Sequence, residues 1–460
     1  MKRLYIVAIS LFLVPIFAIG FISLVDQDAT VSASENRKLK EKPTLSLQTL
    51  FDGSFSKDFE EYYSDTFPFR DALMSVNQGV RNLFTWKGED DVTIVDPGQI
   101  DHIGGGEHLG DLDGEDNSSS QSSSSSSSSV PSSSAPSSST DASSSTDASS
   151  ESTSSQEASS PVQVPDDTEV DNHGGVIIVK DRAMELFSLN EKKLTAYTDT
   201  LNKMKTQLPA STRVFNLLAP TSVEFYSPSK YHSLTQSQKD AFDLAYSQLK
   251  DVIAIDAYSA IAPHTDEYLY FRTDHHWTAR GAYYAYTAFA KQAGFTPVDI
   301  NDFETGQLDG FVGSLYRATQ AQVLKDNPDY VEYFLPNVEN EGMYFKSQDM
   351  TKGTKIYAVA TKVNSSNKYL CFISGDTLLS RFTTDVKNGK SILVIKESYG
   401  NAFVPWLLNH YENVYVCDPR QGTINIPSFV RDNNINDVLA INYAFSACSG
   451  FNKYIDKCLD

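Results

Sequence analysis

Two adjacent histidines beside a carboxylate are unusual in a chain that has only 8 histidines among 460 residues. They are His275 and His276, and Asp274 precedes them. A carboxylate can hold an imidazole in the tautomer that accepts a proton, so Asp274 and His276 have the types and spacing of an orienting group and a general base. Such a base activates a hydroxyl nucleophile, and Ser398, far downstream, is the candidate. These residues indicate acyl chemistry at a serine.

Ser398 follows the apolar run Ile392–Ile395 and precedes a predicted helix over 402–411. A turn from a strand into a helix exposes a side chain at the edge of a sheet. It also directs the first N–H groups of the helix toward the same place, as an oxyanion site requires. Gly400 would allow close approach of the backbone, and Asn401 offers a side-chain donor. The alternative is that Ser398 only caps the helix.

The histidine pair and its neighbours allow further interpretations. Beside Trp277, the imidazoles could be a satisfied polar part of the core. They could also bind a metal ion, but His264 is the only other histidine nearby, so the ligand set is incomplete and we expect neither a metal site nor another cofactor. Arg272 could hold a substrate carboxylate or form an ordinary salt bridge. The predicted substrate-binding or oxyanion residues are Asn401, Tyr399, Gly400, Arg272, Trp277 and His275.

The elements that would position these side chains alternate between strand and helix. Predicted strands cover 214–219, 252–255, 392–395, 414–416 and 438–441, and predicted helices cover 194–208, 237–249, 402–411 and a stretch capped by Thr278. Near-continuous apolar strands between helices indicate an α/β fold with a mostly parallel sheet covered on both faces. Sites in such sheets form outside the carboxyl ends of the strands, which adds Asp256 and residues 220–222 as candidate cleft positions. Residues 301–390 are less regular and predict loops and short strands.

The N-terminus carries an apolar run from Leu4 to Val25 behind Lys2 and Arg3. Its length is the roughly 20 residues that a bilayer-spanning helix needs, and the basic residues place the N-terminus inside. A cleavable signal is the alternative, because residues 31–34 are small. We expect residues 1–26 to be a single-pass anchor or signal in the cell membrane, with the C-terminal domain extracellular.

Residues 27–100 form a predicted membrane-proximal helical segment. Its aromatic side chains recur every three to four residues, and Pro68 separates them from a second helical pattern over 70–86. Val92–Val95 predicts a short strand, which could pair with Val176–Val179. Between these two strands lies an acidic and Ser-rich linker, residues 101–165, which lacks the apolar side chains needed to offset ordering entropy and is predicted to be disordered.

Charge and cysteine content exclude two classes of function. With 38 Lys and Arg against 59 Asp and Glu, the net charge is -21, which repels nucleic acid. No cysteine pair has the C-x-x-C spacing of a zinc site. Cys448 and Cys458 could form a disulfide in an exported chain or remain as buried thiols.

Several stretches together resemble a known family. Residues 271–278 read Phe-Arg-Thr-Asp-His-His-Trp-Thr and are followed by Gly-Ala-Tyr-Tyr-Ala-Tyr at 281–286. This pattern resembles the signature of the DHHW family of bacterial exported proteins. Further stretches agree in order, namely 35–37, 65–70, 395–405 and 418–420. The chain is also similar to the SGNH-hydrolase-like proteins of alginate O-acetylation, whose motif is Asp-x-His-Trp.

The resemblance implies a triad of Asp274, His276 and Ser398, with His275 in the variable position. It also implies that residues 166–460 form an SGNH-hydrolase-like three-layer sandwich, and that a multipass membrane O-acyltransferase supplies the acyl group. The family usually carries Asp before the serine, whereas this chain has Glu397, so the role of that position is open.

We therefore expect a membrane-anchored extracellular O-acetyltransferase or acetylesterase that acts on a cell-envelope polysaccharide through an acyl-serine intermediate. One alternative is a non-catalytic polysaccharide-binding or assembly protein, in which Tyr283, Tyr284 and residues 258–271 would stack against sugars. Another is a metal-dependent hydrolase that uses His275 and His276.

Overall fold

The computed structural model describes residues 31–32, 37–38, 42–46, 54–69, 92–95 and 175–460. The predicted N-terminal span, the second helical pattern over 70–86 and the Ser-rich linker lie outside these residues. Among the helices that are described, none combines the length and the apolar character needed to cross a bilayer.

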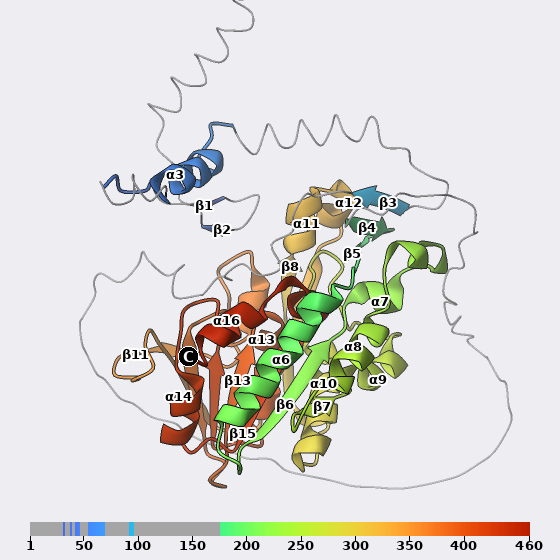
Figure 1. Cartoon of the computed structure of the whole chain (residues 1–460). Coiled ribbons are helices and arrows are strands. Elements are labelled where there is room, and N and C mark those ends of the chain that lie inside the picture. The colour runs from blue at the N-terminus through green and yellow to red at the C-terminus, as the bar shows by residue number, and fades with distance from the viewer. Residues whose placement is uncertain (1–30, 33–36, 39–41, 47–53, 70–91, 96–174) are drawn as a thin grey trace, which may run out of the picture.

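The body is built on an eight-stranded mixed sheet (Figure 1). Its strand order is β11-β10-β12-β14-β13-β15-β6-β7, and the last five run parallel to one another. The parallel strands are β14 (Asn413–Cys417), β13 (Ser391–Lys396), β15 (Asp437–Tyr443), β6 (Arg213–Ala219) and β7 (Ile253–Ile255). The strands that extend the sheet by antiparallel pairing are β11 (Gly353–Ile356), β10 (Asn340–Phe345) and β12 (Leu379–Thr384).

Helices cover both faces of this sheet, as the alternation of apolar strands and helices predicts. On one face, the Tyr197 hydroxyl of α6 (Glu191–Gln207) donates a hydrogen bond to Asn442 of β15. On the other face, Phe215 of β6 packs against Phe289 of α10 (Ala279–Ala293), which also contacts Phe403 of α13 (Tyr399–Leu407). The α/β expectation is therefore confirmed.

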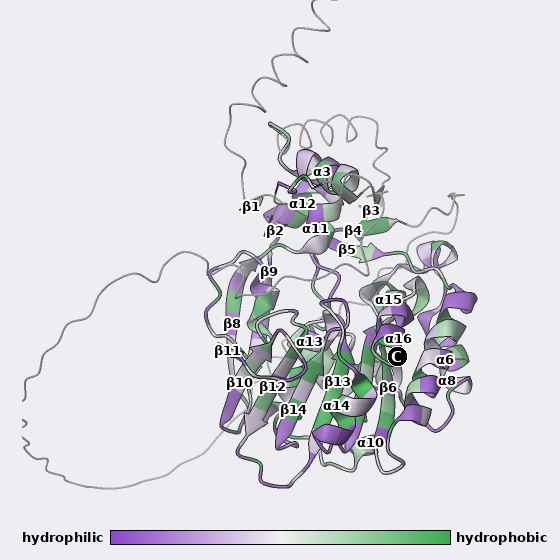
Figure 2. Ribbon diagram, turned by 60° about the vertical axis from the view of Figure 1, so that its left-hand side comes forward, coloured by the Kyte–Doolittle hydropathy of each residue, from purple (hydrophilic) through white to green (hydrophobic). Residues whose placement is uncertain are grey.

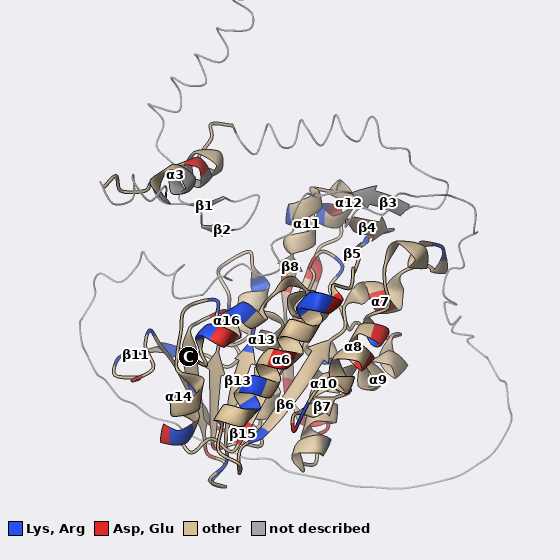
Figure 3. Cartoon of the chain, in the orientation of Figure 1, with Lys and Arg blue, Asp and Glu red and all other residues tan. Residues whose placement is uncertain are grey.

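The central strands have hydrophobic sequences because they are buried on both faces. Every residue of β13 and of β15 is buried, and Figure 2 shows these strands as the hydrophobic centre of the sheet. Charged residues lie instead on the outer helices, for example along α6 (Figure 3). The sequence thus determines which strands lie in the middle, and the nucleophile candidate follows one of them.

Residues 301–390 contain short strands joined by loops, as their sequence predicts. Strand β8 (Glu304–Phe311) pairs with β9 (Asp329–Leu335), and β10, β11 and β12 join the main sheet. The prediction of loops and short strands is therefore confirmed, but the bounds of β8 are not visible in the sequence, because most of its residues are partly or fully exposed and polar and it lacks a continuous apolar run. The sheet is consequently mixed, with its antiparallel part at one edge.

A separate three-stranded sheet contains β3 (Val92–Val95), β4 (Val176–Val179) and β5 (Arg182–Glu185). Strands β3 and β4 are antiparallel, and Val95 is the register partner of Val176. The predicted pairing across the Ser-rich linker is confirmed. The helix predicted around the aromatic residues near the N-terminus is also present, as α3 (Ser54–Asp65).

The remaining described α-helices and strands are short, apart from α8. They are β1 (Val31–Ser32), β2 (Arg37–Lys38), α7 (Ser222–Tyr226), α8 (Gln238–Ser247), α9 (Ala257–Ile261), α11 (Ser314–Thr319), α12 (Gln322–Asp326), α14 (Ile426–Asp432), α15 (Ala444–Ser449) and α16 (Asn452–Lys457).

All four cysteines are free and buried. Cys448 and Cys458 do not form a disulfide, because their thiols lie in different surroundings. The Cys448 thiol is beside the backbone of Asn190, and the Cys458 thiol is beside the backbone of Ile424. Burial raises the pKa of both thiols, which keeps them protonated.

Candidate active site

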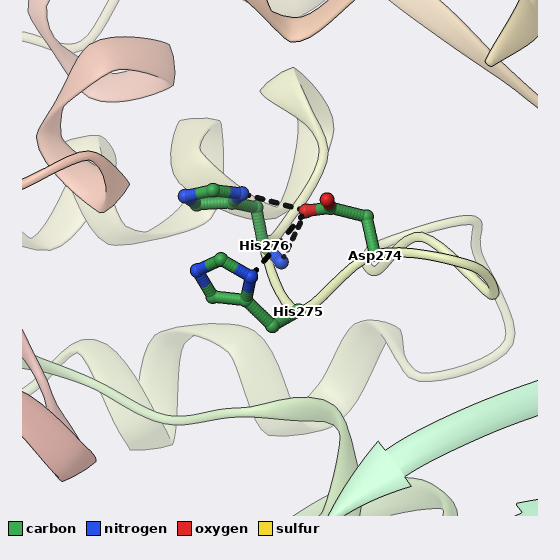
Figure 4. A group of neighbouring side chains, drawn as sticks. All are labelled: Asp274, His275 and His276. Carbon is green, nitrogen blue, oxygen red and sulfur yellow. Dashed lines mark hydrogen bonds and ion pairs between the residues drawn. The ribbon is translucent and has the colours of Figure 1, made fainter. Parts of the chain in front are cut away.

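Asp274, His276 and Ser398 form one hydrogen-bonded series. Nδ1 of His276 lies 2.6 Å from Oδ1 of Asp274, and Nε2 of His276 lies 2.8 Å from Oγ of Ser398. An ionised carboxylate only accepts hydrogen bonds, so Nδ1 carries the proton and Nε2 is left as the acceptor for the serine hydroxyl. Figure 4 shows the histidine side of this arrangement. Its geometry is that of a serine activated by an oriented imidazole.

The motif is held by a backbone loop that closes on itself. Tyr270 and Trp277 form an isolated antiparallel bridge, and the N–H of Thr278 donates to the carbonyl of Leu269. Thr278 then caps α10 by accepting from the N–H of Gly281 at 3.2 Å, as predicted. Gly281 is required here because a Cβ would lie 2.4 Å from the Leu269 carbonyl oxygen. The loop therefore presents the residues between its two ends to Ser398.

Asp274 is fixed from a second direction by the start of α11. The backbone N–H of Ser314 donates to Oδ2 of Asp274 at 2.7 Å, and a Cβ at Gly313 would collide with the Asp274 side chain. Burial would raise the pKa of Asp274, but the neighbouring His276 and the hydrogen bonds to the carboxylate hold it well below its usual range. Neither Gly313 nor Ser314 was predicted as a site residue, although the glycines around residues 310–313 were visible in the sequence.

Asp329 of β9 anchors the two residues before Asp274. Its carboxylate accepts from the backbone N–H of Arg272, from the backbone N–H of Thr273 at 2.8 Å and from the Thr273 hydroxyl at 2.7 Å. Arg272 also pairs with Asp329 and Asp181 through its guanidinium. Arg272 therefore makes the salt bridge that was one of its two predicted roles. No sequence signal connects Asp329 to the motif.

Glu397 caps α13 in place of Ser398. The Ser398 side chain makes no capping hydrogen bond, whereas the Glu397 carboxylate accepts from the N–H of Tyr399 at 2.9 Å and from the N–H of Tyr443 at 3.0 Å. Burial raises the pKa of Glu397, and Arg420 and the two N–H groups partly offset that rise. Because Glu397 satisfies the helix, the Ser398 hydroxyl is available to His276.

The predicted oxyanion donors all have acceptors within the protein. The N–H of Gly400 donates to the Glu397 carbonyl, and the N–H of Asn401 donates to the Ser398 carbonyl. The Asn401 side-chain amide donates to Asp376 at 2.9 Å. Gly400 permits close packing, since a Cβ there would lie 2.5 Å from Cβ of Lys396. A role for these residues in substrate binding stays a prediction.

Two aromatic residues fix the position of the hydrogen-bonded series. Trp277 is fully buried, and its indole N–H donates to the Tyr399 carbonyl at 2.9 Å, so it joins the motif to α13. Tyr369, in a 3-10 helix, stacks its ring on His276 with centroids 4.1 Å apart, and its hydroxyl donates to the Ser398 carbonyl at 3.0 Å. Tyr369 was not predicted, because it lies in the stretch read as irregular.

A buried ionic cluster lies behind the start of α13. Lys396 pairs with Asp376 at 2.5 Å and with Asp418 at 3.3 Å, and Arg420 pairs with both carboxylates at 2.6 Å. Two cations balance two carboxylates, so the group can be buried without a net charge. Through Asp376 this cluster also fixes Asn401. Asp418 and Arg420 belong to the last of the sequence stretches noted above.

The remaining candidate positions have structural partners. Asp256 caps α9 by accepting from the N–H of Ser259, and the Pro220 carbonyl accepts from the Tyr270 hydroxyl. Ligand atoms of Asp274, His275 and His276 do lie within 4.8 Å of one another, as a metal site would require. Both ring nitrogens of His276 are bonded to Asp274 and Ser398, so a metal ion would have to displace one of those bonds.

Comparisons with known proteins agree with the motif. The sequence model described as "DHHW protein" matches residues 35–417. A DHHW family protein from Eubacterium siraeum is 31% identical, with a TM-score of 0.57, and the match covers 63% of this chain and 96% of that one. Bacillus cereus PatB1 has a TM-score of 0.52 at 18% identity, over 61% of this chain and 100% of its own. At that identity the similarity shows a shared fold. None of the curated proteins matches this chain.

Proposed function

This chain belongs to the DHHW family, and we propose that it is a membrane-anchored extracellular O-acetyltransferase or acetylesterase that modifies a cell-envelope polysaccharide. The observation that carries the proposal is the series from Asp274 through His276 to Ser398, with distances of 2.6 and 2.8 Å. A serine that bonds an imidazole whose other nitrogen bonds a carboxylate is equipped to form an acyl ester.

In the first half of the proposed reaction, Oγ of Ser398 attacks the carbonyl carbon of an acetyl ester. The hydroxyl proton passes to Nε2 of His276, and Asp274 stabilises the resulting imidazolium. The bond between the carbonyl carbon and the alcohol oxygen of the donor breaks, and His276 returns the proton to that oxygen. The product is an acetyl ester on Ser398 and a free donor alcohol.

In the second half, a sugar hydroxyl attacks the acetyl-serine. Its proton passes to His276, the bond from the carbonyl carbon to Oγ breaks, and His276 protonates Ser398. Water in place of the sugar gives acetate and makes the enzyme an esterase. Transfer is favoured by the sequence resemblance to proteins of alginate O-acetylation, which also suggests a multipass membrane O-acyltransferase as the source of the acetyl group.

The fold assignment supports the same chemistry. Helices on both faces of the sheet agree with an SGNH-hydrolase-like three-layer sandwich, and a solved structure described as PatB1 with a sulfonyl adduct matches with a TM-score of 0.51 at 16% identity. We propose that residues 1–26 anchor the protein as a single-pass span and hold the C-terminal domain outside the cell.

The proposal is tested by mixing the purified full-length chain with p-nitrophenyl acetate and measuring acetate release and acetylation of Ser398 by mass spectrometry. Wild type should form the acetyl-enzyme, and Ser398→Ala and His276→Ala should not, with unchanged circular dichroism. Phenylmethylsulfonyl fluoride should modify wild type at Ser398 and leave Ser398→Ala unmodified. Equal low turnover in all three proteins would exclude the triad and favour a non-catalytic polysaccharide-binding protein.

A further inference from the structure

Arg182, the first residue of β5, binds the backbone of the catalytic motif. Nη1 of its guanidinium donates to the carbonyl of Tyr270 at 3.1 Å and to the carbonyl of Phe271 at 3.2 Å. Successive carbonyls of an extended strand point in opposite directions, so one nitrogen reaches both only where the chain leaves the extended conformation. Arg182 therefore holds the motif at the place where it bends toward Asp274.

The neighbours of Arg182 hold the next residue of the motif. The N–H of Ala183 donates to the carbonyl of Arg272 at 2.9 Å, and the Asp181 carboxylate accepts from the Arg272 guanidinium at 2.7 Å. The strand β5 is itself paired with β4, and β4 with β3, in the small sheet that lies apart from the main one (Figure 1). The motif is thus attached to a different sheet from the one that carries Ser398.

Packing alone does not explain an arginine at this position. The Arg182 side chain is half-buried, its guanidinium lies 4.4 Å from the centre of the Tyr226 ring, and the two atoms that accept its hydrogen bonds are neutral carbonyls. Partial burial lowers the pKa of Arg182, because the charge has lost part of its hydration. Such a loss opposes folding, so the benefit of the arginine lies in the two carbonyls that it holds.

The stretch that Arg182 holds is joined directly to the catalytic imidazole. The carbonyl of Phe271 accepts from Arg182, and the N–H of Phe271 donates to the carbonyl of His276 at 3.3 Å. Asp274 lies between Phe271 and His276 in the chain. A displacement of this stretch would therefore move Asp274 and His276 relative to Ser398, which follows β13 of the main sheet.

We propose that Arg182 is a positioning residue of the acyl-transfer site, which sets the distance between Nε2 of His276 and Oγ of Ser398 by holding the carbonyls of Tyr270 and Phe271. The guanidinium contacts the backbone of the motif and not the reacting atoms, so it affects the rate of acylation and not the binding of the acyl donor. A misplacement of about 1 Å can slow a reaction by about a hundredfold. This inference rests on the proposed acyl-serine function.

The test uses the full-length chain and two variants of Arg182. Arg182→Met keeps the stem of the side chain and removes both hydrogen bonds, whereas Arg182→Lys keeps a charged donor. Arg213→Met is the matched control, because the Arg213 guanidinium also donates to a backbone carbonyl, that of Ala293, and lies over a ring, that of Phe215. Arg213 stands at the amino end of β6, whereas Ser398 follows the carboxyl end of the parallel strand β13.

The burst of p-nitrophenol at increasing concentrations of p-nitrophenyl acetate gives the maximal acylation rate and the half-saturating concentration. Arg182→Met should acylate about a hundredfold more slowly, with a half-saturating concentration within about twofold of wild type. Arg182→Lys should recover most of the rate. Arg213→Met gives up an ion pair with Asp437, so it should be less stable to urea and still acylate at the rate of wild type. A wild-type rate in folded Arg182→Met would overturn the inference, as would an equal slowing in Arg213→Met.

A second measurement does not need an acyl donor. The proton that Nδ1 of His276 donates to Asp274 should give a downfield signal in proton NMR, identified by its loss in His276→Ala. Arg182→Met should shift or broaden this signal and Arg213→Met should not, and an unchanged signal in Arg182→Met would refute the positioning role. If Arg182→Met does not fold, Arg182→Gln, which can still bond one carbonyl, takes its place in both measurements.

The two measurements separate the inference from the function on which it rests. If wild type forms no acetyl-serine, the proposed function fails, whereas the NMR comparison still decides whether Arg182 positions the motif. If wild type forms acetyl-serine and neither the rate nor the NMR signal changes in the Arg182 variants, the function stands and the inference fails.

Discussion

The Glu397 carboxylate accepts a hydrogen bond from the backbone N–H of Tyr443, 3.0 Å away, and so joins the carboxyl ends of two neighbouring parallel strands. Its second oxygen accepts from the N–H of Tyr399 at the start of α13. One side chain therefore sets the position of the turn that carries Ser398. The Glu397 side chain is long enough to reach both donors.

Shortening this side chain should loosen the turn. In Glu397→Asp, one methylene is lost, so one of the two N–H groups should be left without its acceptor. We expect the free energy of unfolding to fall by about 1 to 2 kcal/mol and acetyl-enzyme formation to slow by about tenfold. Urea denaturation and the rate of p-nitrophenol release measure these effects. The same change at the exposed Glu341 is the control, and a fully active, fully stable Glu397→Asp would contradict the assigned role.

The variant Asp274→Asn tests whether the Asp274 carboxylate orients the His276 ring in addition to binding the backbone of Ser314. The amide can still accept from Ser314, but it can also donate to Nδ1 of His276, which stabilises the tautomer that cannot accept a proton from Ser398. We expect acetyl-enzyme formation to fall by about three to four orders of magnitude. Activity of Asp274→Asn within about tenfold of wild type, measured by the initial burst of p-nitrophenol, would show that this carboxylate does not orient the base.

Tyr369 makes two contacts that can be removed one at a time. Tyr369→Phe keeps the ring on His276 and loses the hydrogen bond to the Ser398 carbonyl, so turnover should fall only a few-fold, in line with about 1 kcal/mol. Tyr369→Ala also removes the stacked ring and should reduce turnover by about a hundredfold. The comparison of kcat for the two variants measures each contact, and equal values would mean that the ring stack contributes nothing.

His410 should make the fold sensitive to acid. Burial, with a smaller effect from Lys390, lowers the pKa of His410 from 6.5 to about 4, and the Tyr286 hydroxyl bonds its Nε2 at 2.6 Å. The unfolded chain takes up this proton near pH 6.5 and the folded chain only near pH 4. The contribution to stability is therefore complete above pH 6.5 and is lost as the pH falls toward 4, by about 2 to 3 kcal/mol.

Urea denaturation between pH 7 and pH 4 measures that loss. His410→Phe removes the titrating group and the bond from Tyr286, so it should be less stable than wild type at pH 7 while changing less between the two pH values. If the free energy of unfolding of His410→Phe falls between pH 7 and pH 4 as steeply as that of wild type, groups other than His410 cause the acid sensitivity.

The parts of this architecture that are visible in the sequence are those that depend on local patterns. The β13 strand is apolar because both its faces are buried, and Thr278 is a cap because its hydroxyl bonds the helix that it precedes. The proximity of Asp274 and His276 follows from their spacing of two residues. Each of these could be predicted from neighbours in the chain.

The rest depends on contacts between distant segments. Asp329 supports the motif through β9, whose partner β8 is a largely exposed strand without a continuous apolar run. Tyr369 contacts His276 only because a short helical turn is folded over the site. Residues of this kind cannot be recognised from the sequence, because a single Asp or Tyr in an irregular stretch has a structural role more often than a functional one.

The register of β3 and β4 has a consequence for how the chain can vary in length. Val95 and Val176 are register partners, so the two ends of the segment between them lie side by side. Closing a loop costs only about 0.6 kcal/mol more each time its length doubles. Insertions and deletions in this segment should therefore be nearly neutral for the free energy of folding, because they leave the pairing of β3 with β4 unchanged.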